Sequence, residues 1–144
     1  TAPVKAPTRY LTAMTDFEQM GGAETVNAVI TDFVNRNFGD FIIGYLFEGR
    51  DKARIIRHES AYAAAHLGGP NAYQGKPIAS THRPLRINSG HFRRRLAILR
   101  TTLRDHGVNE DIIARWIALE EKLETVVTDG THCGPPTPFG PSST

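Results

Sequence analysis

The stretch RHESAYAAAHLGGP, residues 57–70, decides how the rest of this sequence is interpreted. It predicts a helix that ends at two glycines and a proline, because glycine favours the left-handed turn after a helix and proline cannot continue one. Within it, His58 and Glu59 stand among small apolar residues that are typical of a packed helix face. Buried polar groups need partners, so this pair points to a specific role rather than to packing alone.

Helical periodicity extends from this stretch in both directions. Apolar residues recur at three- and four-residue steps from Ala23 up to Gly39, where the pattern breaks. The run FIIGYLF, residues 41–47, predicts a tight corner with buried aromatic side chains. Strand-like alternation is missing, so the fold class is all-α. The predicted helices cover 11–20, a segment from 23, about 51–66, a short piece at 78–83, a segment from Asn88 or Ser89 to Gly107, and a last one capped by Asn109.

The apolar stripes of the last two helices are easy to define. The first consists of Phe92, Leu96, Leu99 and Leu103, and the second of Ile112, Trp116, Leu119, Leu123 and Val126. From residue 128 onward the composition changes to Pro, Gly, Ser and Thr. We therefore expect a flexible arm at 1–12, one domain at 13–127 and a disordered tail at 128–144.

Composition excludes several classes of function. The chain has 144 residues and a formal net charge of +2, which favours neither nucleic acid nor an anionic membrane as a partner. Cys133 is the one cysteine, so no intrachain disulfide can form, and the residue is interpreted as a bystander in the tail. No apolar run is long enough to span a membrane. We expect a cytoplasmic protein, and a monomer.

Two histidines suggest a cofactor. His58 and His82 are 24 residues apart, one in a long helix and the other in a short helix beyond a glycine-rich loop. Two helices could therefore present two imidazoles to a common space, and a neutral imidazole is a good ligand for haem iron. Spacing alone is weak evidence, because a helical histidine is more often a surface residue or a hydrogen-bonded core residue.

Several motifs in register make the sequence resemble the truncated haemoglobins, most closely group 1 of that family. They are Gly-Gly at 21–22, DF at 32–33, LFEG at 46–49, HLGGP with Y.G at 66–75, TH at 81–82, HF at 91–92 and DHGVNEDII at 105–113. The resemblance covers roughly residues 13–127. It implies a truncated globin, a two-over-two helical sandwich that holds haem b.

The resemblance also implies roles for individual residues. His82 corresponds to the proximal iron ligand, and Phe47 to an aromatic residue against the haem face. His58 corresponds to a position that supplies a sixth, distal ligand in some members; the alternative is that it points outward or bonds a propionate. Arg57, Lys76 and Arg83 are further propionate candidates. The cofactor-binding set is therefore His82, His58, Phe47, Tyr73, Val34, Ile55, Glu59, Phe33 and Arg86.

The distal side departs from the family pattern. Val34 and Glu59 stand where the family has a tyrosine and a glutamine, and Ile55 is a third, apolar distal position. The usual hydrogen-bond donors to bound oxygen are thus missing. Glu59 either lies beside the haem as a protonated acid, or leans outward and pairs with an arginine. His66, at the helix end, is interpreted as a residue stabilised by the helix dipole.

These features predict a haem protein that binds O₂, NO and CO at the iron, with a distal histidine ligand. Oxygen binding or NO dioxygenation with a partner reductase is the first hypothesis. Electron transfer, nitrite reduction or peroxidase-like turnover is the alternative, and the sequence leaves enzymatic activity open. A ligand sensor or an interaction module is a second class of function. A helical bundle that binds no haem is the third and simplest class.

Overall fold

The computed structural model describes residues 14–70 and 87–124 of the chain. Every regular element in these two ranges is helical, which confirms the all-α prediction. The short helix predicted at 78–83, the arm and the tail lie outside the described residues. The elements are α2 (Asp16–Met20), α3 (Ala23–Phe38), the 3-10 helix η1 (Gly44–Phe47), α4 (Lys52–His66), α6 (Ser89–Asp105) and α7 (Glu110–Lys122).

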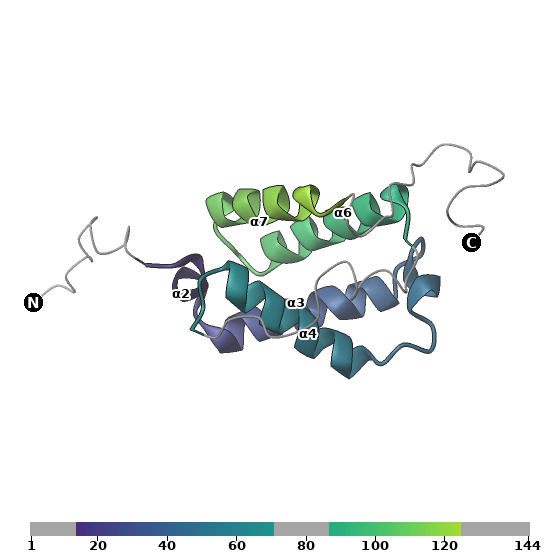
Figure 1. Cartoon of the computed structure of the whole chain (residues 1–144), viewed down its shortest axis with the longest axis horizontal. Coiled ribbons are helices and arrows are strands. Elements are labelled where there is room, and N and C mark those ends of the chain that lie inside the picture. The colour runs from purple at the N-terminus through teal and green to yellow at the C-terminus, as the bar shows by residue number, and fades with distance from the viewer. Residues whose placement is uncertain (1–13, 71–86, 125–144) are drawn as a thin grey trace, which may run out of the picture.

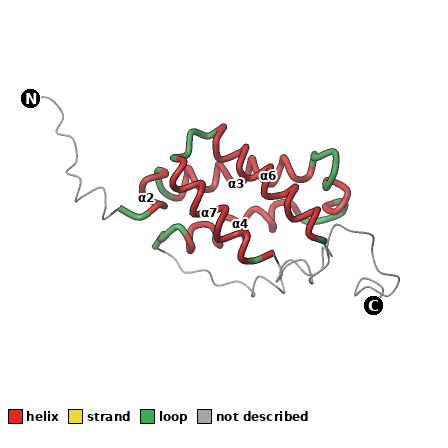
Figure 2. Tube along the Cα trace, turned by 90° about the horizontal axis from the view of Figure 1, so that it is seen from above, coloured by secondary structure: helices red, strands yellow, loops and turns green. Residues whose placement is uncertain are grey.

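The four long helices form two layers. In Figure 1, α6 and α7 make the upper layer, and α3 and α4 make the lower one. Helix α3 contacts α4 within its own layer and α6 in the other, and α6 contacts α7. Figure 2 shows the two pairs from above. The predicted two-over-two sandwich is therefore confirmed.

Side-chain caps define where three of the long helices begin. The Asp51 carboxylate accepts the Arg54 backbone N–H at 3.1 Å and starts α4. Asn88 accepts the His91 N–H at 2.8 Å and starts α6. Asn109 accepts the Asp111 N–H at 2.7 Å and starts α7. Each cap satisfies a backbone donor that the helix leaves free, which is why the cap residues could be predicted from sequence.

The core lies between the layers, on the predicted stripes. All four stripe residues of α6 are buried, as are Ile112 and Trp116 of α7, whereas Leu119 and Leu123 are half-buried. Each fully buried large side chain contributes about 1.5–3 kcal/mol to the hydrophobic stabilisation. The buried residues of α3 that face this core are Val26, Val29, Ile30, Phe33 and Val34.

The glycine pair after α4 brings the ends of two helices together. Gly68 has a positive φ of 90°, which glycine adopts without strain. A Cβ on Gly69 would lie 2.9 Å from the Ala64 carbonyl oxygen and 3.0 Å from the Phe17 ring. The Phe17 N–H donates to the Leu67 carbonyl at 2.9 Å, which ties α2 to the end of α4. The motif therefore allows a close approach that larger residues would block.

The corner between α3 and η1 is built around Asp40. Its carboxylate accepts from Arg94 Nη2 at 2.6 Å and from the backbone N–H groups of Ile42 and Ile43. The Arg94 hydrogen bond, helped by those two backbone donors, lowers the pKa of Asp40 to about 2. The carboxylate thus stays ionised and fixes the corner to α6.

The aromatic side chains of this corner were predicted to be buried, and the prediction is only partly right. Phe47 is buried, but Phe41 and Tyr45 are 99% and 60% exposed. The backbone hydrogen bonds to Asp40 fix the turn so that these two side chains point to solvent, whereas Phe47 packs on Phe38 with ring centroids 5.0 Å apart. Periodicity cannot predict the direction of a side chain in such a turn.

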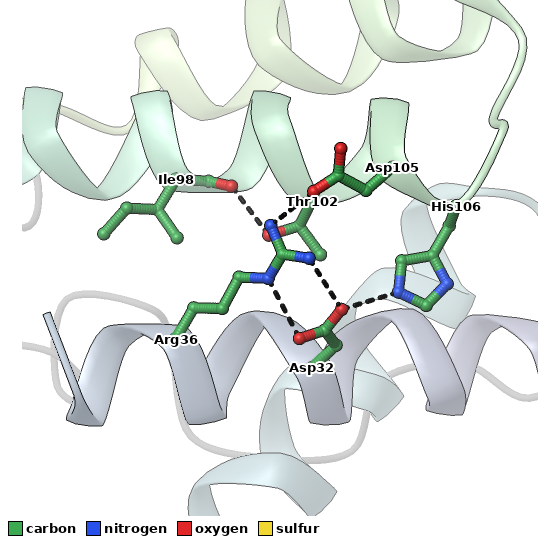
Figure 3. A network of polar contacts seen from close by, with 6 residues as sticks. All are labelled: Asp32, Arg36, Ile98, Thr102, Asp105 and His106. Atoms are coloured by element: carbon green, nitrogen blue, oxygen red, sulfur yellow. Dashed lines mark hydrogen bonds and ion pairs between the residues drawn. The ribbon is translucent and has the colours of Figure 1, made fainter.

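Figure 3 shows the network that joins α3 to the end of α6. Arg36 Nε donates to Asp32 Oδ1 at 2.9 Å, and Arg36 Nη1 donates to Asp105 Oδ2 at 2.8 Å. His106 Nε2 lies 2.8 Å from Asp32 Oδ2. The hydrogen bonds from Arg36 and His106 lower the pKa of Asp32. The DF and DHGVNEDII motifs therefore contribute partners to one surface clamp between the layers.

None of the helices among the described residues combines the length and apolar character needed to cross a bilayer.

We predict that Gly44→Ala lowers the free energy of unfolding by about 1–3 kcal/mol, because the new Cβ would lie 2.7 Å from the Phe38 carbonyl oxygen, a backbone atom. Urea-induced unfolding followed by circular dichroism measures the change. Gly39→Ala is the matched control, since its Cβ meets only an ordinary contact at 3.6 Å. That control should change stability by less than about 0.5 kcal/mol. Equal effects of the two variants would contradict the explanation.

Candidate functional site

The described residues contain six of the nine predicted cofactor residues, and these come from three neighbouring elements. Phe33 and Val34 lie on α3 and are each 1% exposed. Phe47 ends η1 and is buried. The other three, Ile55, His58 and Glu59, lie on α4 and are half-buried. His82, Tyr73 and Arg86 lie outside the described residues, as do Lys76 and Arg83, whereas Arg57 is exposed on α4.

Helix α4 has two neighbouring functional faces. Positions three and four apart are neighbours on a helix, so Ile55 borders both His58 and Glu59, and His58 itself belongs to one of the two faces. Glu59, Ala63 and His66 lie on the adjacent one, which faces a pocket between all four long helices. Tyr62 lies at the boundary and also borders the pocket. One face is thus available to a cofactor while the other packs into the sandwich.

The first face suits the haem that the family resemblance implies. Ile55 and the buried Phe47 provide apolar walls, and His58 provides a half-buried imidazole nitrogen. An apolar wall with one imidazole is the donor set that haem iron requires. In residues 14–70 and 87–124, by contrast, no three His, Cys, Asp or Glu side chains gather as a site for a bare metal ion.

The second face is dominated by an ion triad that joins three helices. Arg95 of α6 donates from Nη1 to Glu120 Oε1 of α7 at 2.8 Å. From Nη2 it donates to Glu59 Oε2 of α4 at 3.1 Å. The guanidinium also lies 5.0 Å from the ring centroid of Phe33 on α3. The side chains of Glu59, Arg95 and Glu120 are 15%, 9% and 6% exposed.

Electrostatics keep the arginine of this triad charged. Burial alone would lower its affinity for a proton, but attraction to Glu120 and Glu59 outweighs burial and raises the pKa of Arg95 above its ordinary value. The two carboxylates therefore share a permanent cation. Glu59 pairs with an arginine, as one of the two sequence interpretations held, but the pair points into the sandwich rather than outward.

His66 matches its sequence interpretation only in part. It is the last residue of α4, yet its ring lies between Tyr62 and Trp116, with centroid distances of 5.2 and 5.0 Å. Its Nε2 is buried and has no hydrogen-bond partner among the described residues. Burial lowers the pKa of His66, although Glu120 and Glu59 oppose that effect. The position of His66 at the end of α4 agrees with its interpretation from sequence, whereas the burial of its ring against Trp116 was not predicted.

Sequence reasoning missed Arg95 and Glu120, although a signal was present. Arg95 directly precedes Leu96 and is three residues after Phe92, so it falls on the apolar stripe of α6. Glu120 is four residues after Trp116, on the stripe of α7. Charged residues of opposite sign at core positions of neighbouring helices indicate a buried ion pair.

We predict that Arg95→Met lowers the free energy of unfolding by about 3–5 kcal/mol, because it leaves two buried carboxylates without their cation. Chemical denaturation measures the loss. Arg93→Met on the same helix is the matched control: its side chain is 69% exposed and lies 3.7 Å from Glu124. It should change stability by at most about 1 kcal/mol. Similar losses in both variants would show that removing the buried cation of the triad costs no more stability than removing an exposed arginine.

Comparison with known proteins identifies relatives of this chain. A family model described as "Bacterial-like globin" matches residues 15–129. The group 1 truncated hemoglobin of Synechocystis is 31% identical over 107 residues, which is 72% of this chain and 86% of that protein. The corresponding protein of Tetrahymena thermophila is 28% identical over 99 residues, or 69% and 82% of the two chains.

Solved structures agree on the fold. The 2/2 hemoglobin of Synechococcus, crystallised in the cyanomet state with covalently attached heme, superposes with a TM-score of 0.73 at 22% identity. The match covers 81% of this chain and 99% of that one. The likeness in fold extends over nearly the whole of that smaller protein.

Proposed function

The chain belongs to the bacterial-like globin family, and we propose on that premise that His82 and His58 hold the iron of its haem b from opposite sides. The matched range, residues 15–129, includes both histidines. Haem-based binding of diatomic gases follows from family membership. The observation that supports the two-histidine proposal is the position of His58, a half-buried residue of α4 that is not a member of the ion triad.

The roles of this chain's residues follow from their chemistry. Haem supplies an iron that binds O₂, NO or CO reversibly. Imidazole from His82 anchors the group, and Phe47 packs against it. His58 would hold the iron as a second imidazole ligand, and a gas would compete with it for binding. An internal ligand lowers the apparent gas affinity by the fraction of molecules whose site is open.

The distal surroundings give bound oxygen little support. Val34 and Ile55 are apolar and carry no hydrogen-bond donor. Glu59 accepts hydrogen bonds from Arg95 in the ion triad, so its carboxylate is occupied as an acceptor. Because hydrogen bonds to charged or partly charged oxygen are the strong ones, bound O₂ should dissociate quickly or the iron should oxidise.

This environment favours redox chemistry as the second candidate. With a histidine on each side, the iron changes its coordination little between oxidation states. Electron transfer benefits from that property, whereas nitrite reduction and peroxidase-like turnover require His58 to leave the iron so that the substrate can bind. NO dioxygenation also needs a reductase to restore ferrous iron. We propose a monomer in which residues 13–127 form the haem domain, flanked by a flexible arm at 1–12 and a disordered tail at 128–144.

The ferric protein should show a low-spin absorption spectrum at neutral pH, and His58→Ala should convert it to a high-spin or water-bound form. The reason is that removal of the distal imidazole leaves the sixth position to water. Absorption spectroscopy of ferric and ferrous protein, with and without CO, measures the change.

Arg54→Ala is the control for that experiment, because Arg54 is exposed on the same helix and its contact to the Asp51 cap uses only the backbone. It should leave the spectrum low-spin. A His58→Ala protein that remains low-spin would refute distal ligation by His58.

His82→Gly should lose haem, or should retain it only when imidazole is added to the buffer, because the proximal ligand anchors the group. Haem content measured after gel filtration, with and without added imidazole, tests this. Full retention of haem with an unchanged spectrum would contradict the proximal role.

A further inference from the structure

The pocket between the two layers contains an imidazole for which neither family membership nor the proposed iron ligation has a use. His66 lines this pocket together with Tyr62, Arg95, Trp116 and Glu120. Its Nε2 is buried and, among the described residues, unpartnered. A buried polar nitrogen without a partner costs free energy, so its retention in the core calls for an explanation.

We propose that His66 is a proton-binding site that takes up one proton when the haem is reduced. The inference rests on the proposed function, since it requires haem beside α4. The site is a new one: it lies eight residues beyond His58, on the helix face that points into the sandwich.

The charges around His66 favour uptake of a single proton. In the triad, two carboxylates share one guanidinium, so these three side chains together carry one excess negative charge while His66 is neutral. A proton on His66 brings that sum to zero. Asp16 of α2 adds a further attraction, reduced by its own ion pair with Arg115 at 2.8 Å. Among the described residues, the titratable and charged groups that face His66 are Glu59 and Tyr62 of α4, Arg95 of α6, Glu120 of α7 and Asp16 of α2.

Burial opposes the attraction of these charges for a proton and keeps His66 unprotonated in the oxidised protein near neutral pH. Desolvation is the largest effect on His66 and lowers its pKa from 6.5. A small additional negative charge raises the pKa again, so proton uptake on reduction begins at pH values below the ordinary 6.5 of histidine. Reduction of the haem by a one-electron donor in solution adds such a charge, and the proton comes from solvent.

The distance between His58 and His66 along α4 makes the effect of haem reduction on proton binding at His66 measurable. Eight residues span about 12 Å of helix. Two unit charges at that distance, at an effective dielectric constant of about 20, change a proton-binding constant roughly tenfold. Tyr62 is four residues from both His58 and His66, and its ring meets the His66 ring edge-on with centroids 5.2 Å apart.

The test is the midpoint potential of the haem protein, measured by spectroelectrochemical titration from about pH 5 to about pH 8. Because reduction favours proton uptake, the potential should fall as the pH rises. For a tenfold difference in proton affinity, the total fall is about 59 mV. His66→Phe keeps an aromatic ring between Tyr62 and Trp116 and removes the proton site, so it should abolish this part of the fall.

Two further variants make the result specific. Glu120→Gln removes one of the attracting carboxylates and should move the midpoint of the fall to lower pH. His106→Gln is the matched control, because His106 also lies beside a carboxylate, Asp32, but outside the pocket; it should behave like the original protein. These three readouts are potentials, so they do not depend on any catalytic activity.

The result that overturns the proposal is a His66→Phe protein with the same pH-dependent fall as the original, or a Glu120→Gln protein in which the fall does not move. In either case the low-spin spectrum and the proposed function would stand. A chain that binds no haem would overturn the proposed function and this inference with it, and a missing Soret band reports that outcome separately.

Discussion

The contact of Arg95 with two carboxylates is the constraint on which the rest of the sandwich depends. It joins α4, α6 and α7 through one guanidinium, and the ring of Phe33 brings α3 to the same point. A buried ion cluster is weak evidence for high stability, because desolvation offsets much of the attraction. The triad instead restricts how the helices pack, because only one rotation of α4 and one register of α6 against α7 bring all three charges together.

That rotation determines what each side of α4 can do. With Glu59 turned toward Arg95, the preceding residue His58 lies on the neighbouring face of α4, and Ile55, one turn before both, borders the two faces. Glu59, which the sequence allowed to lie beside a gas ligand, therefore pairs with Arg95 in the interior. His58 is then the polar group of the cofactor face. If it binds iron as proposed, gas affinity would be governed by competition with this internal ligand rather than by hydrogen bonds to bound oxygen.

The sequence allowed prediction of the features that depend on local rules, and not of those that depend on distant pairing. The caps at Asp51 and Asn109, the stripe of α6 and the stop at Gly68 follow from short-range hydrogen bonds and helical period. Glu59 and Arg95 are 36 residues apart, and no periodicity encodes that one will face the other. The same holds for the burial of His66 against Trp116 and for the exposure of Phe41 in a turn.

The excess carboxylate of the triad also bears on the choice between oxygen carriage and redox chemistry. A fixed negative charge in a protein interior acts over longer distances than one in water, because the effective dielectric constant is lower. Beside the proposed haem, a negative charge shared by Glu59 and Glu120 would stabilise the ferric state relative to the ferrous state that binds oxygen. The apolar residues Val34 and Ile55 act in the same direction, since they give bound oxygen no donor. Charge and missing donors would both favour oxidation of the iron over storage of oxygen, in line with the proposed redox role.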